Sequence, residues 1–180
     1  SAKHEWNLAV YNGTGAGDTG ASKDVAARWM LHPFAGGEGA LRNLQVGVAG
    51  TVGSQGESVA GGFVTNAARL PVTEYATGTR LDGTRSRLGL EFAWFDGPWM
   101  AQAEALYQTQ EMSGTGGDQR VDYGGAYLNV SRVLTGEAKS FGGLEPNRPV
   151  DPYEGTGRGA WVLAARISHL AQDTALRDAG

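Results

Sequence analysis

Arginine is the residue type with the clearest chemical role in this sequence, because four arginines fall close together in and just after a long connecting stretch. They are Arg69, Arg80, Arg85 and Arg87. A guanidinium group is a planar fork of N–H donors that binds an oxyanion through two parallel hydrogen bonds. If the connecting stretch folds inward, these side chains predict a path for anions. The competing prediction is a solvated loop whose arginines pair with Glu74, Asp82 and Glu91.

Other motifs in the sequence give weaker evidence of function. The glycine-rich run at residues 13–20 follows a predicted strand like a phosphate-binding loop, but no helix follows whose N-terminus could hold the phosphate. His4, His32 and His169 are scattered without metal-ligand spacing, and no cysteine is present, so no metal site or cofactor is predicted. No Gly-x-Ser-x-Gly motif indicates a hydrolase. The sequence therefore predicts no enzyme.

Alternating apolar and polar residues predict the elements that position the arginines. Seven segments show this alternation, at residues 5–11, 24–32, 44–52, 87–95, 99–108, 121–134 and 161–168. A period of two is typical of β-strands and not of helices. The predicted fold class is therefore all-β, with antiparallel strands that run up and down.

The connection at residues 95–98 contains the pair Asp96-Gly97, which is typical of a tight type I′ hairpin turn. With that turn, Glu91 is expected opposite Gln102, and Glu104 diagonal to Arg87, within reach of an ion pair. The stretches near 12–22, 54–84 and 112–120 then fall at the opposite end of the strands. The stretches near 34–41 and 135–158 fall at the tight-turn end.

The two faces of the predicted strands differ in chemistry. One face, taken as outward, carries small and aliphatic residues together with all five tryptophans, which are Trp6, Trp29, Trp94, Trp99 and Trp161. Most of these lie near strand ends, where aromatic residues form girdles at the two interfaces of a bilayer. The other face carries polar side chains that we expect to line a water-filled space, namely Glu5, Arg28, Glu91, Gln102, Glu104, Asn129 and Arg166. Their mixed signs indicate a lateral electric field across a pore, or simply a solvated wall.

Length and composition exclude further classes of protein. The chain has 180 residues, and its 41% hydrophobic content is too high for a disordered protein. A net charge of −4 argues against a nucleic-acid binder. The sequence contains no apolar run of about 18 residues, so it predicts no transmembrane helix. A polar interior would be costly in a soluble domain but not in a water-filled barrel, and seven strands need others to close such a barrel in lipid.

Several short runs of residues, in one continuous order along the chain, resemble a known protein family. They are YNGTG at 11–15, SKDVAAR at 22–28, PF at 33–34, LGLEFAW at 88–94, GP at 97–98, QAE at 102–104, LTGE at 134–137, RPVDP at 148–152 and GAWVLAARISHL at 159–170. Together they resemble the phosphate-selective porin O and P family over nearly the whole chain. Val162 departs from the acidic residue usual in that family, and the glycine-rich insertions are unusually long.

The resemblance implies a 16-stranded outer-membrane barrel, usually a homotrimer, that passes small anions or other small solutes. It also implies an arginine ladder as the anion path. Residues 1–180 are then interpreted as a single partial transmembrane β-barrel, a segment of the C-terminal half that lacks strands at both ends. The expected partners are outer-membrane lipids and small solutes. A non-conducting structural barrel and a soluble carbohydrate-binding β-sandwich remain as alternatives.

Overall fold

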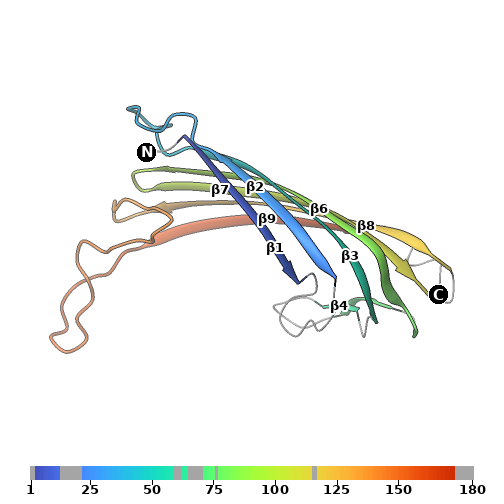
Figure 1. Ribbon diagram of the computed structural model, residues 1–180. Coiled ribbons are helices and arrows are strands. Elements are labelled where there is room, and N and C mark those ends of the chain that lie inside the picture. The colour runs from blue at the N-terminus through green and yellow to red at the C-terminus, as the bar shows by residue number, and fades with distance from the viewer. Residues whose placement is uncertain are drawn as a thin grey trace.

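The chain forms one curved antiparallel β-sheet with a small β-hairpin beside it (Figure 1). The computed structural model describes residues 3–12, 22–58, 62–64, 71–75, 77–114 and 117–172. The large sheet contains β1 His4–Asn12, β2 Lys23–Leu31, β3 Gln45–Ser58, β6 Arg80–Asp96, β7 Trp99–Ser113, β8 Gln119–Val133 and β9 Val162–Gln172. The hairpin contains β4 Gly62–Val64 and β5 Pro71–Glu74.

The strands of the large sheet follow one another in chain order, β1-β2-β3-β6-β7-β8-β9, and every neighbouring pair is antiparallel. The predicted seven strands and their up-and-down order are therefore confirmed. Several of them are longer than the alternation indicated, because β3 continues to Ser58 and β6 begins at Arg80. The part of the chain that the structure describes contains no helix long and apolar enough to cross a membrane.

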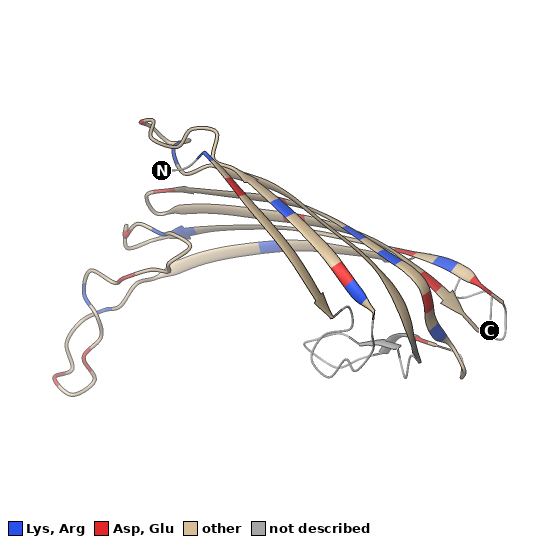
Figure 2. Cartoon of the chain, viewed as in Figure 1, with Lys and Arg blue, Asp and Glu red and all other residues tan. Residues whose placement is uncertain are grey.

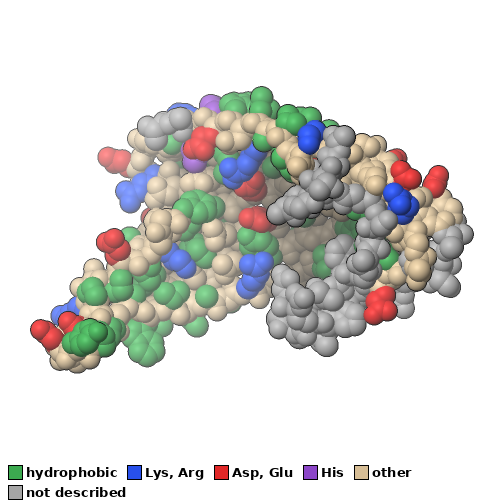
Figure 3. Space-filling view, turned by 60° about the horizontal axis from the view of Figure 1, so that its bottom comes forward, with side chains coloured by type: hydrophobic (Ala, Val, Ile, Leu, Met, Phe, Trp, Pro, Cys, Tyr) green, Lys and Arg blue, Asp and Glu red, His purple; other side chains and the backbone are tan. Residues whose placement is uncertain are grey.

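The strand register separates the two faces as the alternation predicted. One row crosses all seven strands and carries Trp6, Trp29, Val48, Leu90, Ala105, Ala126 and His169. The neighbouring row on the opposite face carries Glu5, Met30, Gly47, Glu91, Glu104, Tyr127 and Ser168. We call the first the convex face and the second the concave face. Figure 3 looks into the hollow of the concave face, where charged side chains gather under the arch.

Large apolar side chains on the convex face are exposed rather than packed. Trp6 is 71% exposed, Leu90 55% and Ile167 72%. The buried apolar residues all have concave register positions near the strand ends; they are Met30, Ala93, Phe95, Met100, Met112, Val121 and Val133. Within the described residues, no second layer covers the convex face, which is the layer that a soluble β-sandwich requires.

The turn between β6 and β7 differs from the prediction. Asp96 pairs with Trp99, so Gly97 and Pro98 are the two central residues. Gly97 has a φ of 51°, whereas a proline ring holds φ negative, which fits a type II′ turn and excludes type I′. The predicted register was therefore wrong by two residues: Glu91 faces Glu104, and Gln102 faces Ala93. A shift of two preserves the faces, because side chains alternate with a period of two.

Two connections fold back onto the sheet. Beyond β5, the hydroxyl of Tyr75 lies 3.1 Å from that of Tyr123, a concave-face residue of β8. The end of the connection between β3 and β6 therefore reaches over the hollow, where Figure 1 also shows β4.

At the Gly97-Pro98 end, the long connection between β8 and β9 is fastened at its base. Leu134 N–H donates to the carbonyl of Trp161 at 2.7 Å, and Trp161 N–H donates to the hydroxyl of Thr135 at 3.2 Å. The Thr135 hydroxyl donates to the Glu137 carboxylate, which also accepts from Asn147 N–H at 3.1 Å. These donors hold the pKa of Glu137 below its ordinary value, with the Thr135 hydroxyl as the largest cause.

The turn assignment predicts a specific effect at Gly97. Replacing Gly97 with alanine should lower the free energy of unfolding by about 1–2 kcal/mol, because an L-residue is disfavoured at positive φ. A Cβ at this position meets nothing within 4 Å, so the effect isolates the backbone conformation. Gly124→Ala is the matched control, since its Cβ also meets nothing and its φ is not positive. Urea unfolding of the complete protein in lipid vesicles measures both; equal stabilities would contradict the turn assignment.

Candidate functional site

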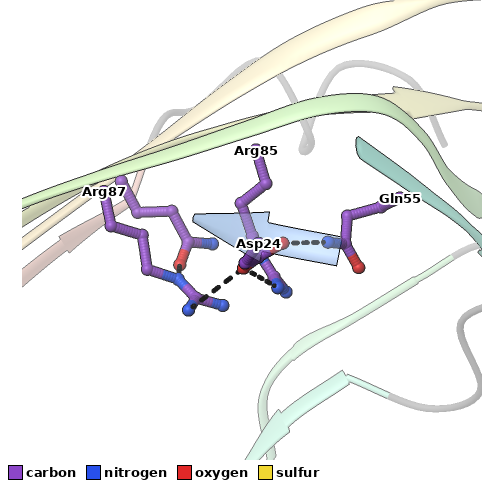
Figure 4. Close-up of polar contacts among 5 residues, drawn as sticks. Asp24, Gln55, Arg85 and Arg87 are labelled. Carbon is purple, nitrogen blue, oxygen red and sulfur yellow. Dashed lines mark hydrogen bonds and ion pairs between the residues drawn. The ribbon is translucent and has the colours of Figure 1, made fainter. Parts of the chain in front are cut away.

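A buried polar cluster on the concave face centres on the carboxylate of Asp24, at the end of the sheet away from the Gly97-Pro98 turn (Figure 4). The Asp24 side chain is 0% exposed. Its Oδ2 accepts from Nη2 of Arg85 at 2.9 Å, and its Oδ1 accepts from Nε2 of Gln55 at 3.0 Å. These donors compensate the carboxylate for the water that it loses on burial.

Gly53 creates the space in which this cluster forms. It pairs with Asp24 on one side and with Arg85 on the other, so it lies between them on the same row. A Cβ at Gly53 would lie 1.9 Å from Oδ1 of Asp24. The missing side chain therefore lets the Asp24 and Arg85 side chains meet across the backbone of β3.

Arg87 extends the cluster toward the hollow. Its Nε donates to Oε1 of Gln108 at 3.0 Å, and its Nη1 lies 3.9 Å from Oδ2 of Asp24. Its side chain is 28% exposed, compared with 8% for Arg85. Arg87 is therefore the more accessible arginine of this cluster.

A second ion pair, between Arg28 and Glu91, lies farther along the concave face. Nε of Arg28 donates to Oε1 of Glu91 at 2.8 Å, and Nη2 donates to Oε2. This is the two-pronged geometry that arginine forms with a carboxylate. The pair joins β2 to β6 across β3, where Arg28 pairs with Ala49 and Glu91 with Gly47. Its side chains are 41% and 25% exposed, so water screens it more than the Asp24 cluster.

A third group lies on the strands β7, β8 and β9. The guanidinium of Arg166 stands 3.7 Å from the ring centroid of Tyr127, which is a cation–π contact. Tyr127 pairs with Glu104 across β7 and β8. Arg166 shares its own row with Gln102 and Asn129. Each of these residues faces the hollow, as the alternation predicted.

The charges of the concave wall nearly balance. The described concave positions of the large sheet carry four arginines and five carboxylates, which are Arg28, Arg85, Arg87, Arg166, Glu5, Asp24, Glu57, Glu91 and Glu104. Their formal charges sum to −1. Figure 2 shows the two signs interleaved along the strands rather than separated into patches. This wall therefore has a varied local field with almost no net excess of either sign.

The tryptophans gather on the convex side near one end of the sheet. The rings of Trp6 and Trp29 stack at 5.7 Å, and His4 stacks on Trp29 at 5.9 Å. Trp94 donates from Nε1 to the carbonyl of Ala40 at 2.7 Å. All five, including Trp99 and Trp161, lie toward the Gly97-Pro98 end of their strands. The five tryptophans therefore lie toward one end of the strands, and not at both ends as two aromatic girdles would require.

Comparison with known protein families gives a match over almost the whole chain. A profile of the phosphate-selective porin O and P family matches residues 1–179. The chain belongs to this family. A protein of Caulobacter vibrioides, described only as uncharacterized, is 32% identical over 105 residues, which cover 53% of this chain and 21% of that protein. The matching part of the chain thus spans about a fifth of the relative's length.

Within this porin-family sheet, the four arginines of the predicted ladder do not form one row. Arg85 and Arg87 come together on the concave face around Asp24. Arg80 pairs with Ser58 and Ser113, which are convex-face positions. The pairing of β6 with β7 shifts by two residues between Leu81 and Arg85, where Gly83 has a φ of 103°. A shift of two leaves each residue on its own face. Arg69 lies outside the described residues.

The ion-pair partners also differ from the sequence prediction. Arg87 was expected to pair with Glu104, but it faces Gln108, because the turn sets the register two residues away from the predicted one. Glu91 does pair with an arginine, although this is Arg28 rather than one of the four clustered arginines. Asp82 accepts a hydrogen bond from the Ser113 hydroxyl at 3.4 Å.

Sequence reasoning missed the residues that organise the cluster, namely Asp24, Gln55, Gln108 and Gly53. The alternation already placed Asp24 on the inward face of its strand. Its partners depend on the registers of two further strand pairs, which the alternation does not supply. The sequence feature that could have indicated the cluster is a single acidic residue on the inward face, Asp24, with a glycine on a neighbouring strand, Gly53.

Removing the carboxylate from the Asp24–Arg85 pair should lower the free energy of unfolding more than removing it from the Glu91–Arg28 pair. Replacing Asp24 with asparagine should lower the free energy of unfolding by about 3 kcal/mol or more, because Arg85 is left as a buried charge without its carboxylate. Replacing Glu91 with glutamine should cost about 1 kcal/mol or less, because its pair with Arg28 is partly solvated. Urea unfolding of both variants in lipid vesicles compares them. Equal losses would contradict the assigned burial.

Gly53 offers an independent test of the same cluster. A Gly53→Ala variant should be destabilised by about 1–3 kcal/mol, because the added Cβ displaces the Asp24 carboxylate from its donors. Gly56→Ala, on the same strand, should be nearly neutral, since its Cβ meets nothing within 4 Å. The same unfolding measurement applies, and a neutral Gly53→Ala variant would show that the Asp24 cluster forms differently.

Proposed function

We propose that this chain forms part of the wall of a water-filled β-barrel channel in the outer membrane, through which small solutes diffuse passively. The observation that carries the proposal is the single-layer sheet with an exposed apolar convex face and an ionic concave face. Lipid solvates the first surface and water the second, so neither needs a protein layer over it. Membership of the porin family supports the same conclusion.

The open edges of the sheet support completion by further strands. Within the described residues, β1 and β9 are the two edge strands and do not pair with each other. Unpaired backbone groups are not tolerated in the hydrocarbon region, so other strands must pair with both edges in a membrane. We propose a closed barrel of the 16-stranded porin type, assembled as a homotrimer, with residues 1–180 as one section of its wall.

The nearly balanced charges of the concave face bear on which solutes pass. Asp24 neutralises Arg85, and Glu91 neutralises Arg28, so neither arginine is available as a free anion site. Arg87 lies farther from Asp24, at 3.9 Å, and Arg166 is in none of the ion pairs among the described residues; both face the hollow. We propose weak overall selectivity from this section, with Arg87 as its main contact for small anions such as phosphate. No catalytic step is part of this function.

Conductance of the complete protein in planar bilayers tests the proposal. We expect stable, ohmic channels in potassium chloride, and a reversal potential under a salt gradient that shifts toward cation selectivity in Arg87→Gln. The shift follows from the loss of one positive charge from the lumen wall. Phosphate should also block Arg87→Gln less strongly than the unmodified protein.

Arg120→Gln is the matched control, because Arg120 has a convex-face register position opposite Glu111. It removes the same charge at the same end of the sheet and should leave the reversal potential unchanged. A folded barrel without conductance would contradict the channel and favour the non-conducting structural barrel. A reversal potential that Arg87→Gln and Arg120→Gln shift equally would remove Arg87 from the anion path.

A further inference from the structure

Arg132 is a cation on the convex face at the Gly97-Pro98 end of the sheet. It pairs with Trp99 on β7 and with Leu163 on β9, both of which have convex register positions. Its Cζ lies 4.9 Å from the ring centroid of Trp99. None of the ion pairs among the described residues involves Arg132. A guanidinium at this position is stabilised by the Trp99 ring but has no protein anion beside it.

The surroundings of Arg132 are those of a membrane interface. Arg132 lies one residue before the end of β8, and a charged residue on a lipid-facing wall costs least near the bilayer surface. Trp161, Leu134 and Leu163 lie at the same end of the sheet and are 66%, 58% and 65% exposed. The carboxylate on the same row, Asp96, is on the far side of Trp99, two strand spacings of about 4.8 Å away.

We propose that Arg132 and Trp99 form a binding site for the phosphate of a phospholipid headgroup in the leaflet at the Gly97-Pro98 end. The guanidinium supplies a planar fork of donors that matches two phosphate oxygens. Trp99 holds the guanidinium flat against the wall, and the exposed leucines beside it receive the upper acyl chains. The inference rests on the proposed membrane channel, because only a lipid-embedded convex face brings headgroups to this position.

Thermal unfolding of the complete protein in maltoside micelles, titrated with a short-chain phosphatidylglycerol, tests the site. The lipid should raise the unfolding temperature of the unmodified protein. Arg132→Gln should need about tenfold more lipid for half of this rise, because the charged hydrogen bonds to phosphate are lost. Arg132→Lys keeps the charge without the fork and should fall between them. Arg158→Gln, an exposed arginine in the connection before β9, should match the unmodified protein.

Inorganic phosphate at the same concentrations separates a lipid site from a free anion site. We expect it to leave the unfolding temperature unchanged; a rise equal to that with lipid, lost in Arg132→Gln, would overturn the lipid assignment. Equal lipid responses of Arg132→Gln and the unmodified protein would also overturn it. If Arg132→Gln does not give a folded, heat-modifiable barrel, the Arg132→Lys titration decides. Conducting channels with an unaltered lipid response would refute this site while leaving the proposed channel intact.

Discussion

The alternation of side chains along a β-strand is the constraint on which this structure depends. Each strand presents successive residues to opposite faces, and a sheet of one layer therefore has two surfaces with independent chemistry. Here the convex surface is apolar along the middle of the strands, while the concave surface carries nearly balanced arginines and carboxylates. A soluble protein would have to cover the first surface, whereas a bilayer solvates it directly.

The concave wall shows how long charged side chains are accommodated without a packed core. Gly53 of β3 leaves open space over the backbone, and the ion pair of Asp24 with Arg85 forms across it. The pair of Arg28 with Glu91 also spans β3, beside Gly47, where the sulfur of Met30 fills the space over the glycine. These contacts fix side chains across three adjacent strands, and they also neutralise part of the positive charge of the concave wall.

The strands and their faces could be predicted from the sequence because the alternation is a local property. The prediction placed Arg28, Glu104 and Asn129 on the same face, and the register confirms it. Contacts between strands could not be predicted in the same way, because they depend on the register of each pair. One wrong turn assignment at Asp96 and Gly97 moved Glu104 away from its true partner. Arg80 lies an odd number of residues before Arg85 and Arg87, so the alternation itself places it on the other face.

The central claim is that the convex face contacts lipid and the concave face contacts water. The natural chain has no cysteine, so single cysteines can be introduced at Val48, between Trp29 and Leu90, and at the next residue, Ala49. Labelling of the protein in lipid vesicles with a charged, water-soluble thiol reagent compares the two positions. We expect fast labelling of Ala49→Cys, little labelling of Val48→Cys, and equal labelling after unfolding in urea. Equal or reversed labelling in the folded protein would contradict this claim.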